Sequence, residues 1–278
     1  MSTAHRHRAP GMLKHTLEGP AAVQAHVEPD REFMATLAKG LAVLRAFGEE
    51  RPTMTLSEAA AAVNLSRATA RRILRTLAEL GYVAQQGRQF SLAPRVLELG
   101  FRFLSTQSWI ERAEPLMTGL SEDLGESCSA SVLQDTDIVY VAHVPTRRIM
   151  AASVTIGTRL PAFHTSMGRV QLGFLPDAEI WRRLRSVQVE AFTPSTIVDI
   201  GALFERVKQD RAQGFAIVDE ELERGLRSIS VPLLTRSGHN FAALNLNAHS
   251  HRTTRSELRE RFLPRMRQVA NALGGFAP

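Results

Sequence analysis

The sequence predicts the α/β (α+β) fold class, with a small helical N-terminal domain, a linker helix and a larger C-terminal domain. Within residues 33–92, apolar residues recur at helical spacing and a short hairpin pattern follows. From Trp109 onward, helical segments alternate with strands that are joined by hairpin turns. Strands joined in this way and flanked by helices indicate an α/β domain with a largely antiparallel sheet.

Length and composition agree with two domains. The chain has 278 residues, of which 44% are hydrophobic. Its single cysteine, Cys128, excludes an internal disulfide framework and a multi-cysteine zinc site, and suits a reducing compartment. We find neither a long apolar span nor the apolar segment of a secretory signal. We therefore expect a cytoplasmic protein with no membrane partner.

The first elements form a compact helical unit. Residues 1–32 contain scattered Pro and Gly without a sustained period, which indicates a flexible arm. A first helix is expected over Phe33–Phe47, and Gly48 suits its end. A second helix is expected over Ser57–Val63, with Thr55 or Ser57 as its N-cap.

A sharp turn at Asn64 leads into a third helix that Ser66 caps and Gly81 ends. The segments Tyr82–Ala84 and Gln89–Leu92 then alternate around a Gly-containing turn, as in a β-hairpin. Three helices followed by a hairpin predict a winged helix-turn-helix over residues 33–92.

The third helix predicts contact with DNA. On a helical wheel, Ala70, Ile73, Leu77 and Leu80 share one side, and arginines spread over the opposite side. The N-terminal half of such a helix enters the major groove, and an Arg fork reads guanine or holds a phosphate. The candidate DNA-binding residues are Ser66, Arg67, Ala68, Thr69, Arg71, Arg72, Arg75 and, at the wing tip, Arg88.

The charge distribution supports this prediction over a merely solvated Arg-rich face. Residues 33–92 carry eight basic and four acidic side chains, whereas residues 1–32 carry four of each. Residues 93–278 carry 22 basic and 20 acidic side chains. Most of the net charge of +6 therefore lies in about a fifth of the chain.

Residues 93–107 predict the linker helix. Pro94 suits its first turn, and the helix Arg95–Ser105 is apolar on more than one face. Such a helix needs partners on two sides, so we expect it to pair with a second subunit.

The remaining residues, 108–278, predict an effector-binding and oligomerisation domain. We expect helices over Ile110–Leu124, Ser166–Phe174, Leu203–Gln213 and Arg255–Leu273, and strands over Cys128–Leu133, Ile138–His143, Arg148–Val154, Ile229–Leu234 and Phe241–Leu246.

Five motifs in order make the chain similar to the IclR family of bacterial transcription regulators. They are LAKGLAVLRAF (37–47), LSRATARRILRTLAELGYV (65–83), FSLAPRVLELG (90–100), GTRLPAFHTSMGRV (157–170) and GFAIVDEELERGLRSISVPL (214–233). Residues 124–154 further resemble the branch that contains PcaR, PcaU and PobR, regulators of aromatic-acid and β-ketoadipate catabolism.

The resemblance implies a homodimer or dimer of dimers on palindromic double-stranded DNA, controlled by a small aromatic or dicarboxylic acid. Protocatechuate, 4-hydroxybenzoate and β-ketoadipate belong to this class of effector. The branch implies an activator, with RNA polymerase as a further partner. A repressor that responds to a different carboxylate, or a DNA-binding protein without a ligand, remains an alternative.

The effector is expected where a strand leads into the helix that begins at Ser166, since free N–H groups at a helix start suit a carboxylate. The resemblance implies contacts from Ser166, Met167, Asp219 and Ser228, the last replacing a cysteine that many relatives have. Further candidates are Ile149, Ala151, Leu160, His164 and Thr165. An acidic turn that only caps or is solvated is the alternative for Asp219, and a core histidine is the alternative for His164.

The sequence lacks four common motifs of enzyme active sites and nucleotide-binding loops. There is no G-x-S-x-G, no Walker A loop, no G-x-G-x-x-G and no H-E-x-x-H. We therefore expect no catalytic residues, no metal site and no cofactor.

Overall fold

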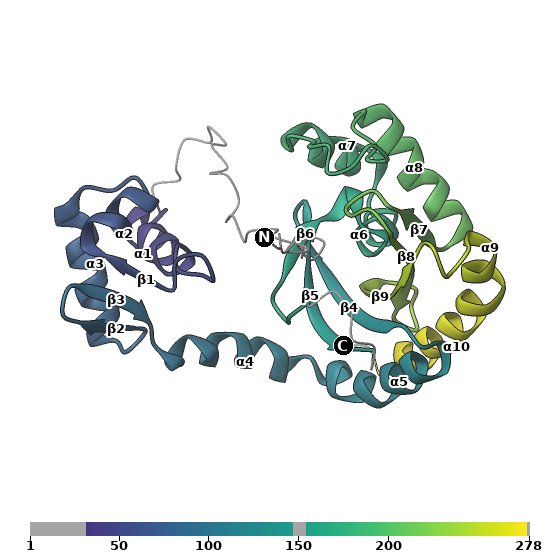
Figure 1. The fold of residues 1–278 in the computed structure, drawn as a ribbon, viewed down its shortest axis with the longest axis horizontal. Helices are drawn as coiled ribbons and strands as arrows, with labels where there is room; N and C mark the ends of the chain where they lie inside the picture. The colour runs from purple at the N-terminus through teal and green to yellow at the C-terminus, as the bar shows by residue number, and fades with distance from the viewer. Residues whose placement is uncertain (1–31, 147–153, 277–278) are drawn as a thin grey trace, which may run out of the picture. The chain divides into compact units, whose positions relative to one another are not determined.

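The computed structural model describes residues 32–146 and 154–276 (Figure 1). Most of the predicted arm, and all but the last residue of the strand expected over Arg148–Val154, lie outside these residues. The chain divides into two compact units between Ser105 and Thr106.

The N-terminal unit has the predicted winged helix-turn-helix. Its helices are α1 (Ala35–Arg45), α2 (Leu56–Ala62) and α3 (Arg67–Glu79), and its wing is formed by β2 (Val83–Gln86) and β3 (Gln89–Leu92). A short strand, β1 (Thr53–Thr55), was not predicted and pairs antiparallel with β3, which gives the sheet order β1-β3-β2. Met54 lies opposite Phe90, and both are buried in the core of this unit.

Side-chain caps set the ends of α2 and α3. Thr55 accepts a hydrogen bond from the Glu58 N–H at 3.3 Å, and Glu58 Oε2 accepts one from the Thr55 N–H at 2.7 Å. This capping box identifies Thr55, one of the two expected candidates, as the N-cap. Asn64 has a φ of 49°, as the sharp turn requires. Ser66 caps α3, as predicted.

The linker region begins with a 3₁₀ turn, Pro94–Val96, and continues as α4 (Leu97–Thr106). No residue of α4 is buried against the described parts of the chain. Leu97 and Phe101 are each at least 70% exposed, and Leu99 and Phe103 are also exposed. Exposed apolar side chains of this kind often mark an interaction surface, and the pairing of this helix with a second subunit stays a prediction.

The C-terminal unit contains a six-stranded antiparallel sheet in the order β6-β5-β4-β9-β8-β7. This confirms the predicted fold class. The strands are β4 (Ser127–Gln134), β5 (Asp137–Val144), β6 (Arg159–Pro161), β7 (Ala216–Asp219), β8 (Leu226–Leu234) and β9 (Asn240–His249). The short edge strands β6 and β7 were not predicted.

Helices cover this sheet. They are α5 (Ser108–Leu124), α6 (Ser166–Leu172), α7 (Asp177–Ser186) and α8 (Ile200–Gln213). The C-terminal helical segment comprises α9 (Arg255–Glu257), a wider π turn (Leu258–Phe262) and α10 (Leu263–Gly274). The helix α7 was not predicted. In the part of the chain that the structure describes, no helix is long and apolar enough to cross a membrane.

The position of α6 defines the interior of this unit. It packs against β4, β8 and β9, and α8 packs on it in turn (Figure 1). Helices α5 and α10 pack against each other and against β5 and β8 respectively. Side chains alternate along β9, so Ala243 and Asn245 share one face while Leu244 and Leu246 share the other. All four are buried, which shows that both faces of this strand are covered.

Gly168 permits the close approach of α6 to the 3₁₀ turn Ala162–His164. A Cβ at position 168 would lie 2.1 Å from the carbonyl oxygen of Ala162. No side chain fits at that distance, so α6 begins directly against the turn that precedes it. This contact fixes the positions of Thr165 and Ser166 at the start of α6.

Candidate functional site

The first candidate site is the outer face of α3. Ala70, Ile73 and Leu74 are buried, and Leu77 is half-buried, so the helix rests on the core as the sequence predicts. The prediction was wrong for Leu80, which is 51% exposed although its spacing placed it on the inner side of the helix. It is the C-cap residue of α3, and the chain leaves the helix there.

The outward side of α3 presents the predicted basic residues. Arg67, Arg71, Arg72 and Arg75 are exposed, as is Ala68. Ser66 and Thr69 are committed to the cap, since Ser66 Oγ lies 3.2 Å from the Thr69 N–H and 2.9 Å from Thr69 Oγ1. Their hydroxyls therefore hold the start of α3 in place.

Arg88 lies in the turn between β2 and β3, beside Gly87, whose φ is +61°. It is exposed at the tip of the wing. A basic wing beside a basic helix is the arrangement by which winged proteins hold DNA backbone. The contacts with DNA remain predictions.

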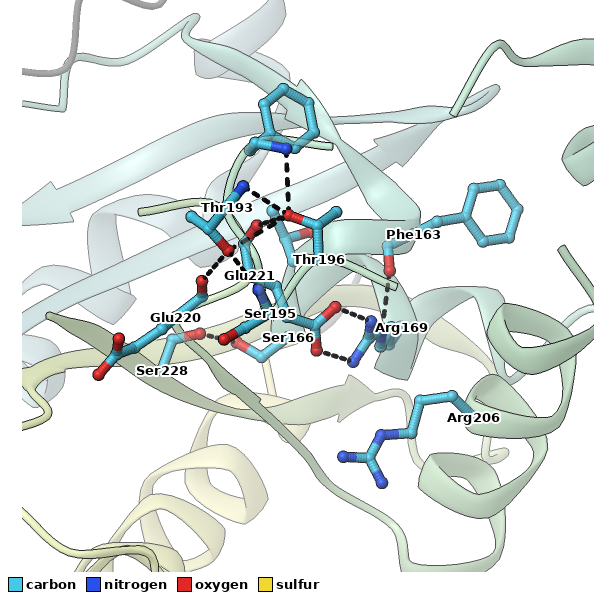
Figure 2. A network of polar contacts seen from close by, with 12 residues as sticks. Phe163, Ser166, Arg169, Thr193, Ser195, Thr196, Arg206, Glu220, Glu221 and Ser228 are labelled. Atoms are coloured by element: carbon cyan, nitrogen blue, oxygen red, sulfur yellow. Dashed lines mark hydrogen bonds and ion pairs between the residues drawn. The ribbon is translucent and has the colours of Figure 1, made fainter. Parts of the chain in front are cut away.

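The second candidate site is a buried polar cluster where α6 begins. Ser166 Oγ donates to Ser228 Oγ at 2.9 Å and lies 2.7 Å from Ser230 Oγ. Ser228 and Ser230 come from β8, on the side of the sheet that faces α6. All three serines are less than 9% exposed. Figure 2 shows Ser166 and Ser228 side by side.

Asn245 from β9 completes this cluster. Its Nδ2 donates to Ser166 Oγ and Ser230 Oγ, each at 3.1 Å, and to the Ile229 carbonyl at 3.2 Å. The carbonyl only accepts, so it fixes the orientation of the amide. Asn245 Oδ1 is then left buried and without a hydrogen-bond partner among the described residues. An unsatisfied buried acceptor of this kind costs roughly 1–3 kcal/mol.

The sequence reasoning missed Asn245 and Ser230. Both were in reach of the alternation rule, because Ser230 and Asn245 pair directly across β8 and β9. A strand with the pattern Asn-Leu-Asn places its polar residues on one buried face when both faces are covered. The sequence predicts this strand over Phe241–Leu246, but the alternation alone does not show that α6 covers the face that carries Asn245.

His164 and an internal ion pair lie next to this cluster. Arg169 and Glu221 form two hydrogen bonds, at 2.9 and 2.5 Å, and Arg169 Nε also donates to the Phe163 carbonyl at 2.8 Å. His164 is 3% exposed and packs edge-on against the ring of Phe192. Burial, and then the charge of Arg169, lowers the pKa of His164 to about 4, so the imidazole is neutral at pH 7.

The segment 192–196 is hydrogen-bonded to the turn that contains Glu221. Thr193 Oγ1 donates to the Glu220 carbonyl and Thr196 Oγ1 to the Glu221 carbonyl, each at 2.6 Å. Figure 2 shows both threonines above this turn and Arg169 beside the Glu221 carboxylate. The backbone of the turn is therefore bound by the threonines, and its Glu221 side chain by Arg169.

Asp219, a predicted effector contact, forms ion pairs in the structure, and its contact with an effector stays a prediction. In the register of β7 and β8, Asp219 lies opposite Arg227 and Val218 lies opposite Ser228. Neighbouring residues on a strand point to opposite faces, so Asp219 points away from the serine cluster. Its carboxylate is bound by Arg227 at 2.7 and 2.8 Å and by Arg255 at 2.7 Å. It therefore joins the end of β7 to β8 and to α9 through two ion pairs, which differs from the capping or solvated carboxylate given as the alternative.

The other predicted effector residues lie around α6. Thr165 is its N-cap and accepts from the Gly168 N–H at 3.0 Å. Met167 is buried in the core of this unit, and Leu160 on β6 packs against that core. Ile149 and Ala151 lie outside the described residues. The helix α6 has seven residues, and the Thr165 hydroxyl already accepts from one of the N–H groups at its start.

No group of three or more His, Cys, Asp or Glu side chains that could hold a metal occurs within residues 32–146 and 154–276. Cys128 is fully buried, and burial raises the pKa of its thiol.

Comparisons with known protein families give matches over both units. The model described as the bacterial transcriptional regulator IclR C-terminal domain matches residues 101–274. The model of the IclR helix-turn-helix domain matches residues 36–87.

Two curated relatives cover most of the chain. The Pca regulon regulatory protein of Pseudomonas putida is 42% identical over 84% of this chain and 81% of its own length. The p-hydroxybenzoate hydroxylase transcriptional activator of Acinetobacter baylyi is 34% identical over 87% of this chain and 91% of its own.

Solved structures give the same result. A transcriptional regulator from Rhodococcus sp. RHA1 is 44% identical, with a TM-score of 0.76 over 88% of this chain and 98% of that chain. The inducer-binding domain of the Acinetobacter regulator PobR, a double mutant in complex with 3-hydroxybenzoic acid, is 28% identical. Its TM-score is 0.56 over 60% of this chain and 98% of that chain.

Proposed function

Because the chain belongs to the IclR family of bacterial DNA-binding transcriptional regulators, we propose that it activates a catabolic operon in response to a small aromatic acid. The relatives it matches are regulators and not enzymes, in agreement with the expectation from the motifs. The names of these relatives support the aromatic class, since one is a p-hydroxybenzoate hydroxylase transcriptional activator and a double mutant of the PobR inducer-binding domain was solved with 3-hydroxybenzoic acid.

The observation that carries this proposal is the polar cluster of Ser166, Ser228, Ser230 and Asn245. It provides hydroxyl groups for a carboxylate and one free acceptor, Asn245 Oδ1, for a donor on the ligand. A phenolic hydroxyl is such a donor. The apolar side chains of Met167 and Val218 are buried in the same region and suit an aromatic ring.

We propose that DNA is bound through α3 and the wing on a palindromic operator, by a homodimer or a dimer of dimers. The exposed apolar residues of α4 support pairing between subunits. The effector shifts the equilibrium between two conformations of the dimer only if it binds one conformation more tightly than the other. An activator of this kind would also contact RNA polymerase, and would act in the cytoplasm.

Thermal unfolding with candidate acids tests the effector class. At a hundredfold excess over its Kd, a true effector adds ~2.7 kcal/mol of stability. We expect a rise in Tm with 4-hydroxybenzoate or protocatechuate, and a smaller rise with benzoate, which lacks the ring hydroxyl. No rise with any aromatic acid, or with β-ketoadipate, would leave a ligand-independent regulator.

Substitution of Asn245 tests whether the acids that raise the Tm bind at the polar cluster. Asn245→Ala removes the free acceptor, so we expect the preference for the hydroxylated acid over benzoate to disappear. Asn271→Ala, on the exposed side of α10, is the matched control and should retain it. If Asn245→Ala binds both acids as the parent protein does, the ligand lies elsewhere.

A further inference from the structure

The backbone carbonyl of Leu80, at the C-terminal end of α3, accepts a hydrogen bond from a side chain outside the helix. Gly81 has a φ of +79° and terminates the helix, with the Tyr82 N–H bonded to the Leu77 carbonyl at 2.9 Å. The Leu80 carbonyl accepts a hydrogen bond from Arg95 Nη1, also at 2.9 Å. The carbonyl end of a helix carries partial negative charge, so a guanidinium group is favourable there.

Arg95 covers the residues that follow the helix. A Cβ at Gly81 would meet Arg95 Cδ at 3.4 Å, so the arginine stem lies directly over this glycine. Its guanidinium carbon is 5.7 Å from the centroid of the Tyr82 ring. Arg95 Nε is also 3.6 Å from Glu98 Oε2, on the first turn of α4. One side chain therefore contacts the end of α3, the start of the wing and the start of α4.

The described chain buries no residue of α4, although Val96 and Leu104 are half-buried. Leu97, Leu99 and Phe101 are exposed. The backbone connection is short, with the Ala93 N–H bonded to the Tyr82 carbonyl at 2.9 Å. The hydrogen bond from Arg95 to the Leu80 carbonyl adds a side-chain contact between the start of this linker and the end of α3.

We propose that Arg95 is a positioning residue that fixes the direction of α4 relative to α3. Any displacement of α4 then turns α3 with it, and the outer face of α3 changes its angle to DNA. The second step rests on the proposed function, because it takes α3 as the helix that meets DNA. The first step concerns only the N-terminal unit and can be tested without DNA or effector.

The test measures distances between spin labels on α2 and α4 in the full-length protein. Ala61→Cys and Ser105→Cys introduce two exposed labelling sites, while the buried Cys128 stays unlabelled. Dilution with unlabelled protein restricts the signal to pairs within one chain. We expect one narrow distance population with Arg95, and a broad distribution with Arg95→Met, which keeps the stem but removes every donor.

Two further variants separate the contacts. Arg95→Lys retains a donor and charge, and should restore part of the narrow population. Glu98→Gln removes only the ion pair and leaves the bond to Leu80, so it should match the parent protein. An unchanged distribution in Arg95→Met would overturn the proposal, as would equal broadening in Glu98→Gln.

Affinity for an operator selected from random DNA distinguishes this role from direct DNA contact. If Arg95→Met weakens DNA binding while the distance distribution stays narrow, Arg95 contacts phosphate and the positioning role is wrong. If no operator is selected by the parent protein, the proposed function fails. The distance measurement still decides whether Arg95 positions α4.

Discussion

The ion pair between Arg169 and Glu221 is the buried contact whose loss we expect to cost most. The Arg169 side chain is 0% exposed and that of Glu221 is 6% exposed. Arg169→Met keeps most of the volume of the side chain but removes all of its donors. Glu221 is then left as a buried charge without its partner, and the Phe163 carbonyl loses the hydrogen bond from Nε.

The expected loss follows from the burial of both groups. Removing one partner of a buried ion pair costs ~3–5 kcal/mol. That is a large part of the ~5–15 kcal/mol by which native domains are stable. Arg182 provides the matched control, because it pairs with Glu179 but is 67% exposed. Arg182→Met should lower the free energy of unfolding by less than ~1 kcal/mol.

Urea unfolding, monitored by tryptophan fluorescence, measures the free energy of unfolding of each variant. Trp109 and Trp181 are the two tryptophans of the chain, and both lie in the C-terminal unit. The double variant Arg169→Met, Glu221→Leu removes both charges, so it should regain most of the lost stability.

The reasoning would be refuted by Arg169→Met unfolding within ~1 kcal/mol of the parent protein, since exposed pairs give such values. It would also fail if the double variant were as unstable as the single one. The loss would then come from packing and not from an unpaired charge.

Two other predictions concern DNA binding and pH. Arg72→Ala should weaken operator binding by ~1–3 kcal/mol in a gel-shift titration if Arg72 reads a base, whereas Arg236→Ala, in the C-terminal unit, should not. Unchanged affinity would exclude Arg72 from the interface. Burial raises the pKa of Asp210 to about 6 from 3.8, so the folded state holds this proton more tightly than the unfolded state. That stability is present at low pH and is lost as pH rises through 6, while the lowered pKa of His164 acts in the opposite direction over a similar range. Asp210→Asn should therefore raise stability at pH 7 by ~1–3 kcal/mol and have little effect near pH 4, as measured by urea unfolding. Equal effects at both pH values would contradict the assignment.

Much of the N-terminal unit was predictable because its signals are local. Thr55, Asn64 and Ser66 each satisfy a backbone requirement within a few residues, and the structure has them in the predicted roles. The strand β1 was missed because three residues are too few to show an alternating pattern. Its partner, β3, is more than thirty residues away in the sequence.

The C-terminal site was predictable in part. Ser166 and Ser228 do come together, as the resemblance implied. Asp219 does not join them, because a shift of one residue along β7 moves a side chain to the other face of the sheet. No local pattern shows which residues of a four-residue edge strand face inward. Asn245 was missed for a related reason, since its role depends on pairing with β8 and on α6 covering that face.

The junction at Thr55 has a consequence for how this chain can vary in length. Thr55 is the last residue of β1 and also the N-cap of α2, so strand pairing and helix start share one residue. An insertion between residues 55 and 56 would separate the cap from the helix it serves, or pull Met54 out of the core. Insertions and deletions among relatives should therefore avoid this point. They should occur instead in exposed segments such as residues 49–52, which lie outside both elements.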